Sequence, residues 1–205
     1  MANEIDRVVP PALPLAPEVY ERPYIDQSNS VLRLFFNRLT NVVNTLLSTD
    51  VGGKFLYNPC AAFYSTQDQT ASVVNTGYAV TFNNTSYTST VTLSNNSRIN
   101  VQNSGVYKFD VTLQLEHNNS SETPVTVWEQ KNGSPIAYSA HKFDVKGNDD
   151  YVAHWGFTVS LTANDYIEVY WATGDTQLNL HTATASSPHP GIPSASIDIS
   201  FVSNV

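Results

Sequence analysis

The chain carries five histidines, and their spacing decides whether they could bind a metal ion. They are His117, His141, His154, His181 and His189. Metal ligands must converge on one ion, so histidine ligands often lie one helical turn apart or accompany a cysteine cluster. No pair here has helical ligand spacing, and the chain has a single cysteine. We therefore expect no metal site, and we predict that His154 is a packed strand residue beside Trp155, with metal ligation as the alternative.

Acidic residues close together in the sequence are the next candidates, because paired carboxylates can bind calcium or serve as an acid and a base. Asp149 and Asp150 follow a Lys-Gly-Asn stretch that is typical of a solvated loop, and calcium binding is the alternative. Asp165 and Glu168 are three positions apart at the start of a predicted strand, so their side chains tend toward opposite faces. We expect no acid/base pair at either place.

Nucleophiles also lack a catalytic setting in this sequence. The stretches NSGVY and TGDTQ do not have the strand-turn-helix context of a nucleophile elbow. Cys60 follows Pro59, and no pattern places a base beside it, so we expect a small buried apolar side chain rather than a reactive thiolate. The sequence therefore predicts no catalytic residue, no cofactor and a protein that is not an enzyme.

The charge balance and the N-terminal segment exclude further classes of function. The formal net charge is -8 with only 10 Lys and Arg, whereas binding to a phosphate backbone needs clustered cations. The first residues lack the basic-then-apolar order of a secretory signal, and polar residues interrupt the apolar stretch at 31–47. A single cysteine forms no intrachain disulfide, as in proteins that fold in a reducing compartment. We expect no nucleic-acid partner and no membrane.

The sequence falls into three segments, of which the first is a proline-rich arm at residues 1–27. Its prolines disfavour the interiors of helices and sheets and favour an extended backbone. Between them lie apolar side chains that a solvated linker would not carry. These are Val8, Val9, Leu13, Leu15, Val19, Tyr20, Tyr24 and Ile25. We expect this arm to lie in a groove on a partner, and a disordered tail is the alternative.

The second segment, residues 28–50, is predicted to be one amphipathic helix with Ser28 or Ser30 as its cap. Apolar side chains recur at spacings of 4, 3, 4 and 3, which is the a/d register of a coiled coil. They are Leu32, Phe36, Leu39, Val43 and Leu46. Phe35, Val42 and Leu47 widen the stripe. We expect the helix to associate with its own copies, and packing against its own domain is the alternative.

The third segment, residues 51–205, reads as an all-β head domain. Runs such as STVTLSNNSRINV, GVYKFDVTLQLEH and DYIEVYWAT alternate apolar and polar residues between clusters of turn residues. Seven or more such runs without a competing helical pattern predict a β-sandwich of the jelly-roll type. Within it, Asn132-Gly133 is a favoured type I′ hairpin turn, and Gly105 allows a tight strand start. We expect alternate residues from Tyr107 to Leu115 to share one buried face.

Three stretches of the head carry a resemblance to a known superfamily. VQNSGVYKFDVTLQL places Gly105, Tyr107 and Phe109 at a strand start, VTVWEQKNGSPIAYS is a hairpin, and FTVSLTANDYIEVYW is a strand, a turn and a strand. In this order they resemble the tumour-necrosis-factor-like superfamily, which includes the globular heads of complement proteins. The resemblance covers about residues 55–205 and implies a compact homotrimer. Asn164-Asp165 stands where the superfamily has Gly-Asp, and asparagine tolerates the left-handed backbone expected there.

The N-terminal region is similar to leaders of bacteriophage structural proteins. The stretch LPLAPEVYERPYIDQ, followed by NSVLRLFFNRL, carries this resemblance. It implies a virion protein, assembled in the host cytoplasm, whose arm and helix attach it to a particle while the jelly roll faces outward.

Together these observations lead us to expect a trimeric capsid decoration or cement protein that binds the major capsid protein, or another virion protein, and stabilises the shell. The alternative is a head or tail fibre, or adhesin, that binds a host surface glycan. Its loops would be Asn118–Glu122, Lys146–Asp150 and Thr173–Gln177. A soluble ligand that clusters a receptor is a third possibility, and the apolar arm counts against it.

Overall fold

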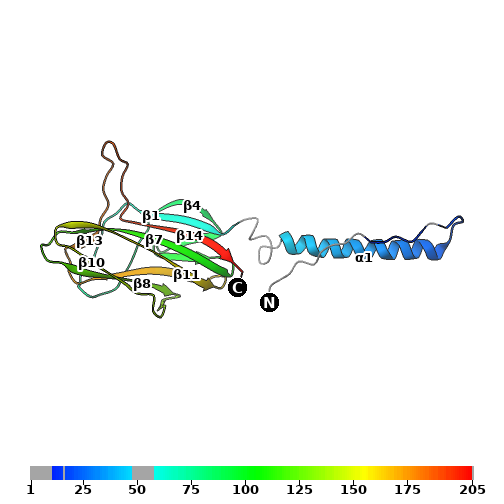
Figure 1. Ribbon diagram of the computed structural model, residues 1–205, viewed down its shortest axis with the longest axis horizontal. Helices are drawn as coiled ribbons and strands as arrows, with labels where there is room; N and C mark the ends of the chain where they lie inside the picture. The colour runs from blue at the N-terminus through cyan, green and yellow to red at the C-terminus, as the bar shows by residue number, and fades with distance from the viewer. Residues whose placement is uncertain (1–10, 16, 48–57, 205) are drawn as a thin grey trace. The chain divides into compact units, whose positions relative to one another are not determined.

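A computed structural model describes residues 11–15, 17–47 and 58–204 of the chain (Figure 1). The chain divides into an N-terminal unit, Met1–Tyr57, and a head, Asn58–Val205. The predicted head boundary at residue 51 and the last three residues of the predicted helix, 48–50, lie outside the described residues.

The N-terminal unit contains one helix, α1 (Arg22–Leu47), which begins earlier than the predicted start at residue 28. The prediction was wrong because it treated Pro23 as a helix breaker. Proline is tolerated in the first helical turn, where its missing N–H has no intrahelical partner. Ile25 N donates the first helical hydrogen bond, at 3.3 Å, to Glu21 O. Ser28 therefore lies inside the helix and is not its cap.

Residues 11–15 of the arm form neither helix nor strand, and the same holds for residues 17–20. No helix among the described residues is long and apolar enough to cross a membrane.

The head is an all-β sandwich of antiparallel strands (Figure 1). The strands are β1 (Cys60–Ser65), β2 (Gln69–Thr70), β3 (Tyr78–Ala79), β4 (Asn84–Ser89), β5 (Val91–Ser94), β6 (Arg98–Val101), β7 (Gly105–His117), β8 (Thr123–Lys131), β9 (Ser134–Pro135), β10 (His141–Val145), β11 (Asp149–Leu161), β12 (Tyr166–Thr173), β13 (Leu178–Leu180) and β14 (Ala195–Ser203).

Two sheets form the layers of this sandwich. In the first sheet β7 pairs β11 along one side, and β14 and β13 along the other; β14 continues to β1 and β4, and β13 continues to β2. The second sheet has the order β10-β8-β12-β6-β5, with β3 and β9 as short additions. The chain passes repeatedly from one sheet to the other, as in a jelly roll. The predicted fold class, an all-β jelly-roll sandwich preceded by one helix, is confirmed.

The core lies between the sheets and follows the predicted alternation. Tyr107, Phe109, Val111, Leu113 and Leu115 of β7 all point inward and are fully buried. The facing side chains come from the second sheet. These are chiefly Val125, Val127, Ile167, Val169 and Trp171. Full burial of such a side chain stabilises the fold by about 1.5–3 kcal/mol.

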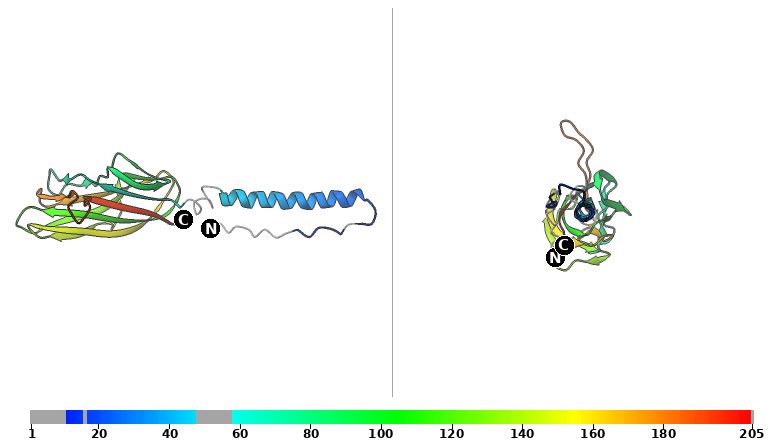
Figure 2. Two further views of the ribbon diagram at one scale, coloured as in Figure 1. Left: turned by 90° about the horizontal axis from the view of Figure 1, so that it is seen from above. Right: turned by 90° about the vertical axis from the view of Figure 1, so that its right-hand side faces the viewer.

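The segment between β13 and β14 projects from the head (Figure 2). Two backbone bridges, Ala183 to Ile192 and Ser186 to His189, hold its two sides together. At its root, Thr182 N donates to Asp68 Oδ1 at 2.7 Å. This projection was not predicted, because HTATASSPHPGIP has no period that indicates paired strands.

Three local predictions from turn chemistry are confirmed. Asn132 and Gly133 both have positive φ, at 52° and 78°, as a type I′ turn requires. Asn164 has φ of 73°, so it adopts the left-handed conformation expected of glycine. A Cβ atom at Gly105 would lie 2.2 Å from a ring carbon of Phe201, so β7 starts where only glycine fits.

The turn at Asn164 gives a direct test of backbone strain. We expect Asn164→Ala to lower the free energy of unfolding by about 1 kcal/mol, because alanine disfavours the left-handed region. Asn164→Gly, the matched control, should leave stability unchanged or raise it. Urea denaturation measures both, and equal losses in the two variants would show that the asparagine side chain matters rather than its backbone angle.

Candidate interaction surfaces

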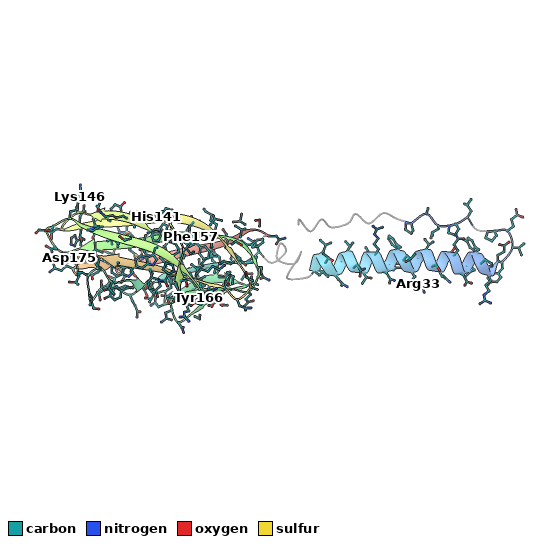
Figure 3. The ribbon with its side chains drawn as sticks, turned by 90° about the horizontal axis from the view of Figure 1, so that it is seen from below. Arg33, His141, Lys146, Phe157, Tyr166 and Asp175 are labelled. Carbon is teal, nitrogen blue, oxygen red and sulfur yellow. The ribbon has the colours of Figure 1, made fainter. Side chains whose placement is uncertain are left out.

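The helix α1 exposes the apolar stripe that the sequence predicted. No residue of α1 is buried. Phe36 is 57% exposed, and Val43 and Leu46 are each 41% exposed. Leu32 and Leu39 complete the stripe and are half-buried. Figure 3 shows side chains projecting from α1, among them the labelled Arg33.

The stripe begins one heptad earlier than predicted. Ile25 lies seven positions before Leu32 and is 37% exposed. Sequence reasoning had placed Tyr24 and Ile25 in the extended arm, which is wrong because both lie on α1. The heptad spacing from Ile25 to Leu32 was the signal that could have placed Ile25 on the helix.

The described part of the arm is also apolar and exposed. Leu15 is 95% exposed, and Leu13, Val19 and Tyr20 are each more than half exposed. Val8 and Val9, the first two predicted contact residues, lie outside the described residues. The role predicted for the arm stays a prediction.

The head has one long strand whose outer edge is open. β11 pairs β7 along its whole length, from Asp149 to Leu161, and no other described strand pairs it. Near its end, Lys131 Nζ donates to Ser160 O at 3.1 Å and covers part of this edge. An unpaired strand edge presents backbone N–H and C=O groups that another chain can bind.

Aromatic side chains fill the side of the sandwich between β10 and β11. The ring of Phe143 lies 5.9 Å from that of Tyr151 and 6.0 Å from that of Trp155. The ring of His141, labelled in Figure 3 with Phe157, lies 6.3 Å from that of Trp155. We call Phe143, Tyr151, Trp155 and His141 the aromatic edge. Tyrosine and tryptophan are enriched at protein interfaces, because they combine a large apolar area with a polar atom.

A buried carboxylate lies under the aromatic edge. Glu129 of β8 is 1% exposed, and its Oε1 accepts a hydrogen bond of 2.7 Å from Trp155 Nε1. Its other oxygen, Oε2, is buried and has no hydrogen-bond partner among the described residues. A buried carboxylate oxygen without a partner is costly.

The three loops predicted for glycan binding meet at one end of the head. Asn119 Nδ2 of the first loop donates to Asp175 Oδ2 of the third at 2.6 Å. Asn148 N of the second loop donates to Asn119 O at 2.8 Å. We call Asn118–Glu122, Lys146–Asp150 and Thr173–Gln177 the distal loops. Sequence reasoning named them separately, and the structure brings them together.

His117, at the end of β7, joins these loops from beneath. Its side chain is fully buried. Nδ1 lies 3.2 Å from Lys146 O, and Nε2 lies 3.2 Å from Asp175 Oδ2. The sequence did not single out His117, because the alternation of β7 only indicates that its side chain points inward.

Asp175 is held as a carboxylate by its donors. The backbone N–H of Gln177 and the side-chain amide of Asn119 donate to it, and together with His117 they outweigh burial and lower its pKa below the ordinary 3.8. A charged Asp175 accepts bonds from all three neighbours at once.

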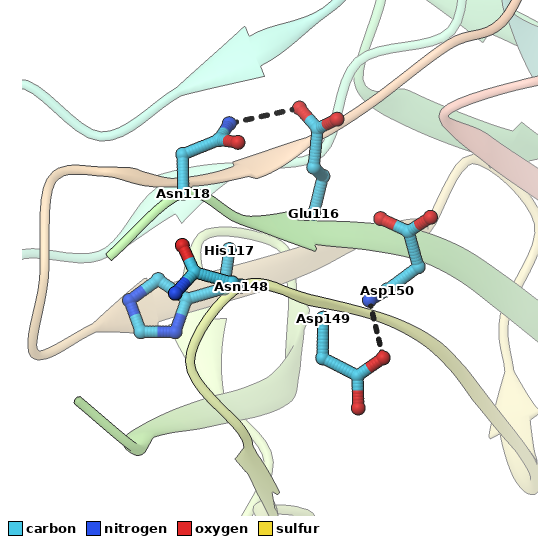
Figure 4. Close-up of a pocket in the computed structure, with 6 residues that line it drawn as sticks. All are labelled: Glu116, His117, Asn118, Asn148, Asp149 and Asp150. Carbon is cyan, nitrogen blue, oxygen red and sulfur yellow. Dashed lines mark hydrogen bonds between the residues drawn. The ribbon is translucent and has the colours of Figure 1, made fainter. Parts of the chain in front are cut away.

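A small polar pocket of about 260 Å³ opens beside His117 (Figure 4). It is lined by Glu116, His117, Asn118, Asn148, Asp149 and Asp150. Asn118 Nδ2 donates to Glu116 Oε2 at 3.0 Å, and Asp150 N donates to Asp149 Oδ1 at 3.0 Å. Within the described ranges, no three His, Cys, Asp or Glu side chains converge to hold a metal ion.

Two predictions about single residues were wrong. His154 is exposed, with Nδ1 3.1 Å from Thr112 Oγ1, because alternation along β11 points its neighbour Trp155 inward instead. Cys60 is half-buried rather than buried, since it starts β1 at the end of the sandwich.

No family model matches the sequence, and no curated protein matches it. Similar solved structures include murine APRIL, with 11% identity and a TM-score of 0.49 over 71% of this chain and 99% of that chain. Another is the globular domain of zebrafish complement 1qA, with 13% identity and a TM-score of 0.47 over 72% of this chain and 99% of that chain. Neither likeness bears on what this protein binds.

The charge on Asp175 predicts how the head responds to acid. Because its pKa is lowered by folding, the stability that it contributes is present above the ordinary value of 3.8 and is lost as the pH falls through the lowered value. We expect Asp175→Asn to cost about 1–3 kcal/mol at neutral pH and less as the pH falls below 3.8.

Urea denaturation across this pH range measures the difference between Asp175→Asn and the unmodified chain. Asp144→Asn is the matched control, because that carboxylate is 56% exposed beside Lys142 and should contribute under about 0.5 kcal/mol. A loss at Asp175 that is the same at every pH would contradict the charged role.

Proposed function

We propose that this protein is a non-enzymatic structural component of a viral capsid, a homotrimeric decoration or cement protein. It binds the shell through its N-terminal arm and stabilises it while the head faces outward. The observation that supports this most is that a β-sandwich with its own buried core follows a helix, α1, of which no residue is buried. The apolar side chains of this helix would be buried when it packs against a partner.

The helix supplies the first contact between copies. Its stripe repeats with heptad spacing from Ile25 through Leu32 and Leu39 to Leu46, and Phe36 and Val43 fill the alternate positions. Full burial of each of these side chains is favourable by about 1.5–3 kcal/mol. This gain outweighs the low helix propensity of the asparagines in α1. Three helices packed along this stripe would gather three chains.

The head supplies a second contact between copies. The open edge of β11 lies beside the aromatic edge, and both end near the buried Glu129. A neighbouring head packed here would cover Tyr151 and pair backbone groups of β11. Each of these contacts removes a penalty that the lone head carries.

The arm then attaches the trimer to the particle. Leu13, Leu15, Val19 and Tyr20 are open to a groove on the major capsid protein or another virion protein. After one arm binds, the other two bind intramolecularly, so three weak contacts give a strong attachment. Arms that reach different shell subunits would cross-link them and resist mechanical stress.

A fibre or adhesin that binds a host glycan is the second candidate. It is favoured by the distal loops, which meet around Asp175 and His117 at one end of the head. The copy number in purified particles separates the two functions. About one trimer per few shell subunits fits a decoration protein, and only a few copies fit a vertex or tail fibre.

The helix interface is tested by charge on the stripe. We expect Phe36→Asp with Leu39→Asp to shift the mass by light scattering from three times the 22.6 kDa chain toward a single chain, because buried carboxylates are unfavourable. Asn37→Asp with Asn41→Asp, on the opposite face of α1, adds the same charge and should leave the trimer intact. An unchanged mass in the stripe variant would remove α1 from the interface.

Attachment is tested by removing the arm before the helix. We expect deletion of residues 1–20, which leaves Glu21 and all of α1 in place, to give a folded trimer that no longer sediments with purified particles lacking this protein. Substitution of Leu13, Leu15, Val19 and Tyr20 by serine should weaken binding in the same way. Full binding by the truncated trimer would place the anchor elsewhere in the chain.

A further inference from the structure

The two bonds of His117 cannot both be donated by a neutral imidazole. Lys146 O is a carbonyl and Asp175 Oδ2 is a carboxylate oxygen, so both partners only accept. A neutral ring has one N–H and one lone pair, whereas the protonated ring has an N–H on each nitrogen. Only the protonated ring therefore satisfies both acceptors in this arrangement.

These two bonds tie the turn at 146–148 to the third distal loop. The turn joins β10, which pairs β8 through Val145, to β11, which pairs β7 from Asp149 onward. The segment that contains Lys146 and Gly147 lies directly on the first distal loop, where a Cβ atom at Gly147 would be 2.2 Å from the backbone of Ser120. The amide of Asn148 binds Asn119 O. Release of Lys146 O from His117 would loosen this contact and change the walls of the pocket in Figure 4.

We propose that His117 is a pH-sensitive clasp that holds the distal loops closed when its ring is protonated and releases the Lys146 segment when the ring is neutral. The bond that survives is the one to Asp175, because a carboxylate is the stronger acceptor. The clasp therefore closes when the ring binds its second proton and opens when the ring loses it.

The charged groups around His117 come from four elements. Asp175 lies between β12 and β13, and Asp149 faces His117 in register at the start of β11. Glu116 on β7 and Asp150 on β11 line the same pocket, and Lys146 lies in the turn before β11. The surrounding charge is mainly negative. Because the pKa of Asp175 is lowered, this side chain is charged at any pH above its ordinary value of 3.8.

The clasp goes beyond the proposed function and does not depend on it. It belongs to the isolated head, whether the distal loops face solvent on a decorated shell or bind a glycan at a fibre tip. In either setting it makes the shape of the exposed end of the head depend on pH.

Hydrogen exchange of the full chain, followed by mass spectrometry between about pH 5 and 8 and corrected for the intrinsic effect of pH, tests the clasp. We expect protection of the amide of Asn148 to fall about tenfold as the pH rises, the effect of losing one hydrogen bond. The control variant His154→Gln removes an exposed histidine on the same sheet and should keep this dependence. His117→Gln should abolish it. Constant protection in the unmodified chain, or an unchanged dependence in His117→Gln, would overturn the proposal.

Nitrogen NMR of the unmodified chain keeps the test independent of whether His117→Gln folds. Both ring nitrogens of His117 should carry a proton near the acidic end of the range, and only Nε2 should carry one near the alkaline end. A single N–H throughout would equally overturn the clasp.

Discussion

The strict alternation of β7 is the constraint on which the rest of the head depends. Its 13 residues pair β11 on one side, and β14 and β13 on the other. Their inward side chains fill the centre of the core, so a shift of one position would expose all of them. The two ends of β7 are fixed by different means, since Gly105 allows the close approach of Phe201 and His117 binds the distal loops.

The N-terminal unit differs from the head, because none of the apolar side chains in its described residues is buried in a core. A helix in water gains little from its own backbone bonds and relies on packing for most of its stability. In α1 of the single chain no side chain is fully buried, so that packing is incomplete. The head folds on its own contacts, whereas the order of the N-terminal unit depends on the association that we propose.

Much of the fold could be predicted from the sequence, because the signals are local. Alternating runs gave the strands, and the residues that favour positive φ placed the turns at Asn132 and Asn164. The predicted start of α1 was wrong because Pro23 was taken to break the helix. A proline is tolerated in the first helical turn, which is where Pro23 lies. The clustering of the distal loops could not be predicted from the sequence, for a different reason. It depends on pairing between β7, β11 and β13, strands far apart in the sequence, and no local pattern reports such pairing.

The exposed stripe of α1 also has a consequence for the timing of assembly. If helix order and association are one event, the fraction of ordered helix rises with the concentration of the chain. Newly made chains would then have folded heads but incomplete anchors until they find partners. If the protein has the function that we propose, complete trimers rather than single chains would attach to the shell, and partial decoration of a growing shell would be avoided.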